Sequence, residues 1–262
     1  SPTKALIAKE EHVMKQLIKG LRQFQSDYVP SHKALMEELS KGQHPRVLFI
    51  ACSDSRVDPA LITQSEIGDL FVIRNAGNII PPYEATNGGE GATIEYAIEA
   101  LGIKQVIICG HSKCGAMKGL LQVGELEDKM PLVYHWLRHT EATRKLVYDN
   151  YGHLDKADLL DAMVGENVLT QIDNLRTYPV IRSKLHRGDL SIHAWIYHIE
   201  NGSILAYDKE QHAFVPPFSR IDPNAVLDGR VEIPTAPPSY LPGASRLARH
   251  KAERIYRGPA TR

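Results

Sequence analysis

Three short runs of uninterrupted apolar residues constrain the fold of this chain more than any other feature. They are RVLFIAC at 46–52, LFVIRN at 70–75 and QVIICG at 105–110. Each has the length and composition of a strand that is covered on both faces, as in a parallel sheet. Between the second and third runs, residues 88–102 repeat apolar side chains at helical intervals and end on a glycine. This order of strand, helix and strand predicts an α/β fold, a mostly parallel central sheet flanked by helices.

An N-terminal helical arm is expected before the first strand. Over residues 5–25 the apolar side chains recur at helical spacing, so we expect an amphipathic helix that ends at residues 28–30, where Pro30 interrupts the pattern. A second, shorter helix is predicted over residues 32–42, directly before the first strand.

The second half of the chain is predicted to be helical and then to form a C-terminal β-hairpin. Helical patterns dominate from about residue 131 to 186. The dipeptide Asn201 and Gly202 then separates two apolar runs, SIHAWIYHIE and SILAYD, which is a strong hairpin signal. We therefore place one catalytic domain, including the arm, over residues 1–215. Residues 216–262 hold eight of the sixteen prolines, so we expect a Pro-rich and basic tail there.

Charge and hydropathy exclude several classes of partner. Thirty-one basic residues balance thirty-one acidic ones, so no net field attracts the chain to nucleic acid or to an anionic membrane. No run approaches 18 apolar residues, and the first residues lack the apolar stretch of a secretory signal, so we expect a cytoplasmic protein. Three cysteines suit a reducing compartment, where thiols act as ligands, nucleophiles or core residues.

Two segments place ligating residues at the carboxyl ends of predicted strands. Cys52 ends the first strand, and His111 and Cys114 follow the third strand within GHSKCG. Ligands bind at the carboxyl ends of strands in open α/β sheets, so the three side chains can converge on one ion. Two thiolates and one imidazole are a known zinc set, and three protein ligands leave a fourth position for water or substrate. Packing of the cysteines in the core is the competing interpretation.

The residues beside these candidate ligands have two interpretations. Asp54 and Arg56 alternate in the segment that leaves the first strand, and an arginine can hold a carboxylate by two hydrogen bonds. The pair either fixes the loop as a structural ion pair or acts in catalysis. In the second case Asp54 accepts a proton from water on the metal, or competes with that water as a fourth ligand, and Arg56 controls which. Cys109 has apolar flanks, so we assign it to the core.

The motif C-S-D-S-R at 52–56, followed by H-x-x-C at 111–114, resembles the β-carbonic anhydrases, which are zinc enzymes. The likeness is strongest over residues 43–119 and includes EIGDLFVIRNAGN. It implies one Zn²⁺ per chain and a catalytic dyad. The implied metal ligands are Cys52, His111 and Cys114, and the implied dyad is Asp54 with Arg56.

The resemblance also implies a substrate pocket for carbon dioxide and bicarbonate. Its residues would be Gln43, Phe71, Tyr96 and the backbone amide of Gly115. Ala76 stands where a larger apolar residue is often found. Phe49 replaces the tryptophan of the subgroup that carries an inhibitory bicarbonate site, so the chain looks closer to the plant-like subgroup, and no inhibition of that kind is expected.

The implied activity is the zinc-dependent, reversible hydration of carbon dioxide to bicarbonate and a proton. Within the family, segments such as LITQSEIGDLFVIRNAGNIIPPY and the terminal AERIYRG resemble the carboxysomal enzymes of cyanobacteria. This implies a place inside a carboxysome, supplying carbon dioxide to carbon fixation. It also implies a homodimer or higher even-numbered oligomer, with the arm packed on the neighbour, and a scaffold protein as the partner of the tail.

Three other functions compete with this one. In the first, the same zinc site acts on another small heterocumulene such as carbon disulfide, and access to the pocket would distinguish the two substrates. In the second, the protein is a catalytically weak scaffold component, which the intact set of site residues disfavours. A cysteine-nucleophile enzyme that uses Cys114 with His111 leaves Cys52, Asp54 and Arg56 without roles.

Overall fold

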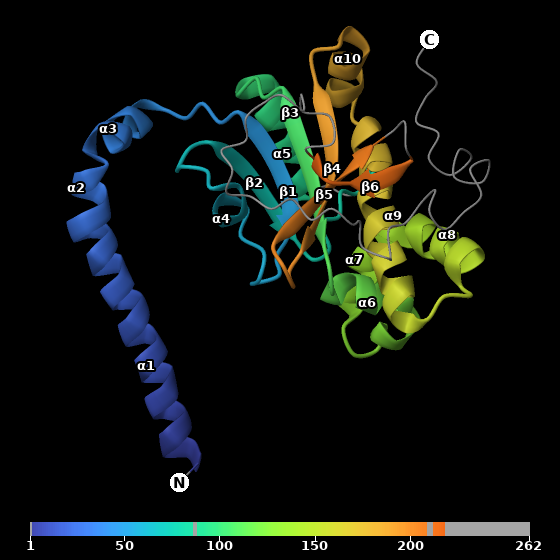
Figure 1. Ribbon diagram of the computed structural model, residues 1–262, viewed down its shortest axis with the longest axis horizontal. Helices are drawn as coiled ribbons and strands as arrows, with labels where there is room; N and C mark the ends of the chain where they lie inside the picture. Colours follow the sequence, from blue (N-terminus) through green and yellow to red (C-terminus); the bar gives the residue numbers. More distant parts are fainter. Residues whose placement is uncertain (1, 86–87, 209–211, 218–262) are drawn as a thin grey trace. The chain divides into compact units, whose positions relative to one another are not determined.

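A computed structural model describes residues 2–85, 88–208 and 212–217 of the chain (Figure 1). The chain divides into two compact units, Ser1–His44 and Pro45–Arg262. Most of the predicted tail, from residue 218 onward, lies outside the described residues. No helix of the described part is long and apolar enough to cross a membrane.

The first unit is the predicted helical arm. Its elements are α1 (Pro2–Gln23), the π-helical turn η1 (Phe24–Tyr28), α2 (Val29–Ser31) and α3 (Lys33–Lys41). The predicted helix end at residues 28–30 is wrong, because the backbone stays helical through Tyr28 (φ −69°, ψ −50°) and Val29 (φ −61°, ψ −46°). Pro30 lies in α2 directly after the π-helical turn η1, and the fixed φ of proline suits this helical backbone.

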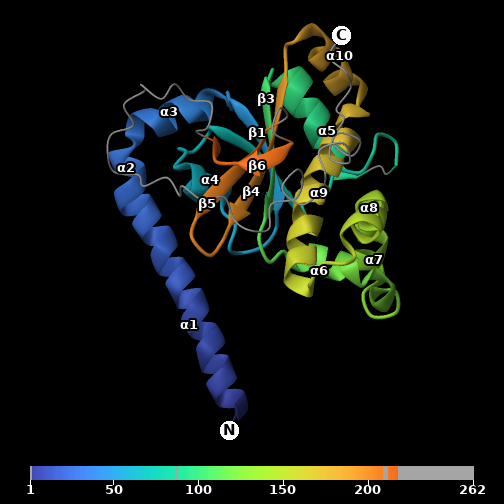
Figure 2. The ribbon, with the colours of Figure 1, turned by 45° about the vertical axis from the view of Figure 1, so that its right-hand side comes forward.

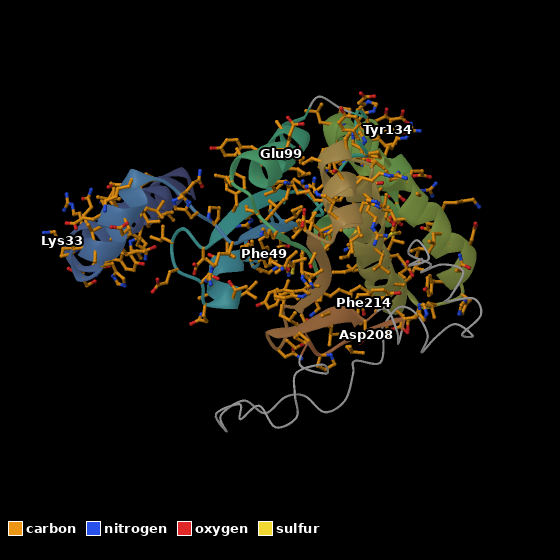
Figure 3. The ribbon with its side chains drawn as sticks, turned by 90° about the horizontal axis from the view of Figure 1, so that it is seen from above. Lys33, Phe49, Glu99, Tyr134, Asp208 and Phe214 are labelled. Carbon is orange, nitrogen blue, oxygen red and sulfur yellow. The ribbon has the colours of Figure 1, made fainter. Side chains whose placement is uncertain are left out.

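The second unit contains a six-stranded sheet in the order β2-β1-β3-β4-β5-β6 (Figures 1 and 2). The strands are β1 (Val47–Cys52), β2 (Leu70–Asn75), β3 (Gln105–His111), β4 (Ser191–His198), β5 (Ser203–Asp208) and β6 (Ala213–Val215). Strands β2, β1, β3 and β4 pair in parallel, and the last two pairings are antiparallel. The predicted mostly parallel sheet and the hairpin of β4 and β5 are therefore confirmed. The short strand β6 was not predicted, and Phe214 lies with Asp208 at this end of the sheet (Figure 3).

Helices connect the strands and cover the sheet. They are α4 (Pro59–Thr63), α5 (Gly89–Glu95), η2 (Tyr96–Ala100), α6 (Gly115–Leu121), η3 (Val123–Leu126), α7 (Pro131–Leu137), η4 (Arg138–Thr140), α8 (Glu141–Tyr151), α9 (Lys156–Arg176) and α10 (Pro179–Arg187). Successive side chains of a strand point to opposite faces, so Leu48 and Ile50 enter the larger core while Phe49 enters a smaller one. Both faces of β1 and β3 are therefore buried, as their apolar sequences predict. The same prediction is wrong for β2, because this strand lies at the edge of the sheet and exposes Val72 on one face.

The close approach of α9 to β3 positions the later part of the site. Helix α9 runs beside β3 and β4 in both views (Figures 1 and 2). A Cβ added at Gly110 would lie 2.7 Å from Cγ2 of Val168 and 3.3 Å from Cγ1 of Val164. Glycine at this position in β3 therefore lets α9 pack directly against the strand that carries His111.

Candidate metal centre

The three predicted ligands come together at the carboxyl ends of two neighbouring strands. Cys52 is the last residue of β1 and His111 is the last residue of β3, and these strands pair in parallel. Cys114 follows at the start of α6, after a loop in which Lys113 takes a left-handed conformation (φ 55°). The ligand atoms of Cys52, His111 and Cys114 all lie within 4.8 Å of one another, and the three side chains are buried.

The imidazole of His111 is oriented for metal binding. Its Nδ1 lies 2.9 Å from the carbonyl oxygen of Ser112, and because a carbonyl only accepts, Nδ1 carries the proton. The lone pair is then on Nε2, which is buried and has no hydrogen-bond partner among the described residues. A buried lone pair without a partner, beside two thiols, fits a metal ligand whose other nitrogen is held by a backbone carbonyl.

The two cysteines are in hydrogen-bond contact with each other. The hydrogen bond from Cys114 lowers the pKa of Cys52, and the same contact raises the pKa of Cys114. The backbone N–H of Gly77 also donates to Cys52 Sγ at 3.4 Å. A divalent cation would stabilise both thiolates at once, so this donor set fits zinc.

Cys109 has a different environment, as predicted. Its side chain is fully buried in the smaller core with Phe49 and Ala51. Burial raises the pKa of Cys109 to about 12, so its thiol stays protonated and does not join the ligand set.

The predicted pair of Asp54 and Arg56 lies beside the ligands. Arg56 donates from Nε to Asp54 Oδ1 at 2.9 Å and from Nη2 to Oδ2 at 2.7 Å. The guanidinium holds the pKa of Asp54 well below its usual range. Oδ2 of Asp54 lies 3.9 Å from Nε2 of His111, so the carboxylate faces the metal position.

The pocket residues implied by the resemblance are only partly brought together. The rings of Phe71 on β2 and Tyr96 at the start of η2 lie 6.1 Å apart at their centroids. Gly115 follows Cys114, and a Cβ added there would meet no atom within 4 Å, which leaves open space beside its backbone. Gln43 belongs to the first unit and stays a prediction.

Glu200 holds the loop between the ligands, a role that the sequence did not predict. Ser112 Oγ donates to Glu200 Oε2 at 2.7 Å, and Lys113 Nζ lies 3.1 Å from Glu200 Oε1. Burial opposes ionisation of Glu200, but hydrogen bonds, first among them that from Ser112, lower its pKa to about 2. The acidic residue directly before the predicted turn was visible in the sequence, although nothing local connects it to a loop 88 positions away.

Arg74 was also missed, and it fixes the backbone around the first cysteine. It donates from Nε to the carbonyl of Cys52 at 3.0 Å and from Nη2 to the carbonyl of Asp54 at 2.8 Å. An arginine within the apolar run LFVIRN was the available signal, because a charged residue in a buried strand needs partners.

Comparisons with known proteins agree with this geometry. A family profile described as carbonic anhydrase matches residues 47–204. A carbonic anhydrase of Synechocystis sp. is 58% identical over 94% of this chain and 99% of its own length. A carbonic anhydrase of Synechococcus elongatus is 49% identical over 95% of this chain and 100% of its own.

Among solved structures, that of the β-carbonic anhydrase CcaA is similar to this fold with a TM-score of 0.77 and 67% sequence identity. The match covers 78% of this chain and 99% of that one. The convergence of two cysteines and one histidine at the strand ends provides the zinc site that such an enzyme requires. The chain therefore belongs to the β class of the carbonic anhydrase family, and it interconverts carbon dioxide and bicarbonate with zinc as its cofactor.

Proposed function

We propose that Asp54 and Arg56 form the catalytic dyad of this carbonic anhydrase. The observation that carries the proposal is the doubly hydrogen-bonded pair itself, with Asp54 Oδ2 3.9 Å from His111 Nε2. Because Arg56 lowers its pKa, Asp54 is ionised at neutral pH and accepts a hydrogen bond more readily than it stores a proton. Asp54 therefore orients the reacting water and directs its proton away from the substrate.

Zinc held by the three ligands supplies the Lewis acid that lowers the pKa of water and makes it a nucleophile at neutral pH. The chain supplies the geometry. Arg56 holds Asp54 and also donates from Nη2 to the carbonyl of Lys113 at 3.3 Å, which ties the dyad to the loop between the ligands. Phe71 and Tyr96 offer aromatic surface to apolar carbon dioxide, and the amide of Gly115 is assigned to a substrate oxygen.

The dyad is tested by Asp54→Asn and Arg56→Ala, with Asp58→Asn as the matched control. Asp58 accepts from the N–H of Leu61 at 3.1 Å as the cap of α4, a role that asparagine also fills. We expect both dyad variants to keep their zinc and to lose about a hundredfold in the rate of hydration, because the reacting water is no longer held in the correct orientation. Metal analysis and stopped-flow hydration measure this. Wild-type rates in both dyad variants would leave the pair only a structural role.

We further propose that the chain functions as a homodimer or a higher even-numbered oligomer through α1. Six large apolar residues on one side of this helix and its extension are 39 to 61% exposed: Val13, Met14, Leu17, Ile18, Leu21 and Phe24. A stripe of this kind needs a covering surface, and a second copy of the chain is the partner that the resemblance implies.

The setting that we propose is a carboxysome, where the enzyme would supply carbon dioxide to carbon fixation. Both cyanobacterial relatives match at least 94% of the chain. The unmatched part is shorter than the tail at 216–262, so the matched region includes most of the tail. The family profile, in contrast, ends at residue 204. Because the shared region extends so far beyond the catalytic residues, we assign the tail to attachment to a scaffold protein.

A further inference from the structure

We propose that three amide side chains of α9 act as positioning residues for the zinc centre. They are Asn167, Gln171 and Asn174, here called the amide ladder. They hold the segment 76–81, whose Gly77 donates a hydrogen bond to the ligand Cys52. The proposal rests on the zinc site described above and adds a second layer of residues that controls it.

The amide ladder occupies one side of α9. Its members are spaced by four and three residues, so they lie one above the other on α9. Asn167 and Gln171 are 1% and 0% exposed. Apolar residues fill such positions without the cost of burying polar groups, so buried amides at successive turns indicate a specific set of partners.

Three hydrogen bonds join the amide ladder to the segment 76–81. Asn167 Nδ2 donates to the carbonyl of Gly77 at 3.0 Å. The N–H of Ile80 donates to Gln171 Oε1 at 2.7 Å, and Asn174 Nδ2 donates to the carbonyl of Ile80 at 2.9 Å. The ladder therefore holds the segment at two points, three residues apart.

The orientation of each amide is fixed by what it faces. The Gly77 carbonyl only accepts and the Ile80 N–H only donates, so Asn167 presents Nδ2 and Gln171 presents Oε1 to the segment. The other polar atom of each amide then also has a suitable partner, because Gln171 Nε2 donates to Asn167 Oδ1 at 2.8 Å and to Thr140 Oγ1 at 3.1 Å. Rotation of either amide would break at least two bonds, so the ladder has one satisfied arrangement.

Gly77 connects the ladder to the metal ligand. Its carbonyl is held by Asn167, and its N–H donates to Cys52 Sγ at 3.4 Å. Its φ of 84° favours glycine, and an added Cβ would lie 3.0 Å from Ala116 Cβ and from Met117 Cε. An N–H that points at a ligand sulfur stabilises the negative charge of the sulfur and changes how strongly the sulfur donates electrons to the metal. The ladder thus sets the position of this N–H from the opposite side of the segment.

The test compares Asn167→Leu and Gln171→Met with the control Thr143→Val. The first two side chains keep a similar size and lose the bonds to the segment. Thr143 belongs to the same buried hydrogen-bond network. Its hydroxyl bonds are to Thr140 and Thr170, and neither of these residues lies in the segment 76–81. All three variants should unfold at lower temperature, which controls for general destabilisation.

Two readouts report on the metal itself. The first is the rate of zinc transfer from the full-length protein to a chelator, and the second is the thiolate-to-cobalt absorption band of the cobalt-substituted protein. We expect zinc release to become about tenfold faster in Asn167→Leu and Gln171→Met, with a shifted band, as for other partners of metal ligands. Thr143→Val should match the wild type in both.

The proposal is overturned if the folded ladder variants match the wild type in both readouts. Either variant alone decides the question if the other does not fold. A wild-type protein that bound no zinc would overturn the metal assignment, and the ladder with it. Wild-type zinc binding together with unchanged variants would remove only the ladder.

Discussion

Single residues decide which atoms are available to the metal. His111 uses Nδ1 on the Ser112 carbonyl, so only Nε2 is left as a ligand atom. Cys114 donates a hydrogen bond to Cys52 and lowers its pKa, which favours the thiolate at the position of the proposed ligand atom. Cys109 lies only two positions before His111 in β3, but its apolar environment keeps its thiol neutral.

This contrast between cysteines predicts opposite results for two similar substitutions. Cys52→Ala removes one of three ligands, so we expect zinc to fall from about one per chain to near zero and hydration to be lost with it. Cys109→Ala, the matched control, should keep zinc and rate and lose roughly 1 kcal/mol of stability from a small cavity. Metal analysis and stopped-flow hydration measure both. Full activity of a zinc-free Cys52→Ala protein would refute the assignment of the centre.

The elements place these residues by three separate contacts. Adjacent parallel strands β1 and β3 bring Cys52 and His111 to one edge of the sheet. The turn between β4 and β5 holds the ligand loop through Glu200. Helix α9 packs on β3 at Gly110 and from there reaches the segment 76–81. The centre therefore depends on how closely α9 approaches the sheet.

Gly110→Ala tests the closeness of α9. The new methyl group would lie 2.7 Å from Val168 Cγ2, so the helix must move, and we expect a loss of about 1 to 3 kcal/mol in the free energy of unfolding. Gly124→Ala is the control, because a Cβ there meets no atom within 4 Å. Urea unfolding measures both variants. Equal stability of the two would mean that α9 does not need the glycine.

At the scale of the whole molecule, the arm differs from the catalytic unit in how little of it is buried. None of the residues of η1, α2 and α3 is buried within the described structure, so the arm has no core of its own there. A helix that exposes a continuous apolar face gains most of its stability from packing. This supports the proposed contact between the arm and a second copy of the chain.

The arm is tested by the double substitution Leu17→Gln and Leu21→Gln. Loss of this apolar surface should shift the protein to a smaller assembly, because these side chains are 61 and 56% exposed and lie on the proposed contact face. Lys19→Gln, on the opposite side of the same helix, is the control and should leave the assembly unchanged. Light scattering coupled to size exclusion measures the mass. An unchanged mass in the double variant would place the subunit contact elsewhere.

The tail is tested by deleting residues 220–262. We expect the purified enzyme to keep its hydration activity and to lose its co-purification with scaffold protein, because the catalytic residues all precede residue 216. Unchanged scaffold binding would refute the attachment role. If the oligomer and the activity were lost together, the tail would instead pack against a neighbouring subunit.

The sequence by itself determined the parallel strands, the hairpin and the identity of the ligands. Apolar runs and periodicities are local properties of the sequence. The residue types in the motifs at 52–56 and 111–114 identify the metal ligands directly. Only the tertiary structure decided that the ligand atoms lie within 4.8 Å, that α2 continues the arm past Pro30, and that Glu200 and the amide ladder support the centre. Asn167 and Gly77 are 90 positions apart, and Ser112 and Glu200 are 88. Local patterns show which face of an element is buried, whereas the partner that a buried polar group finds depends on the packing of distant elements.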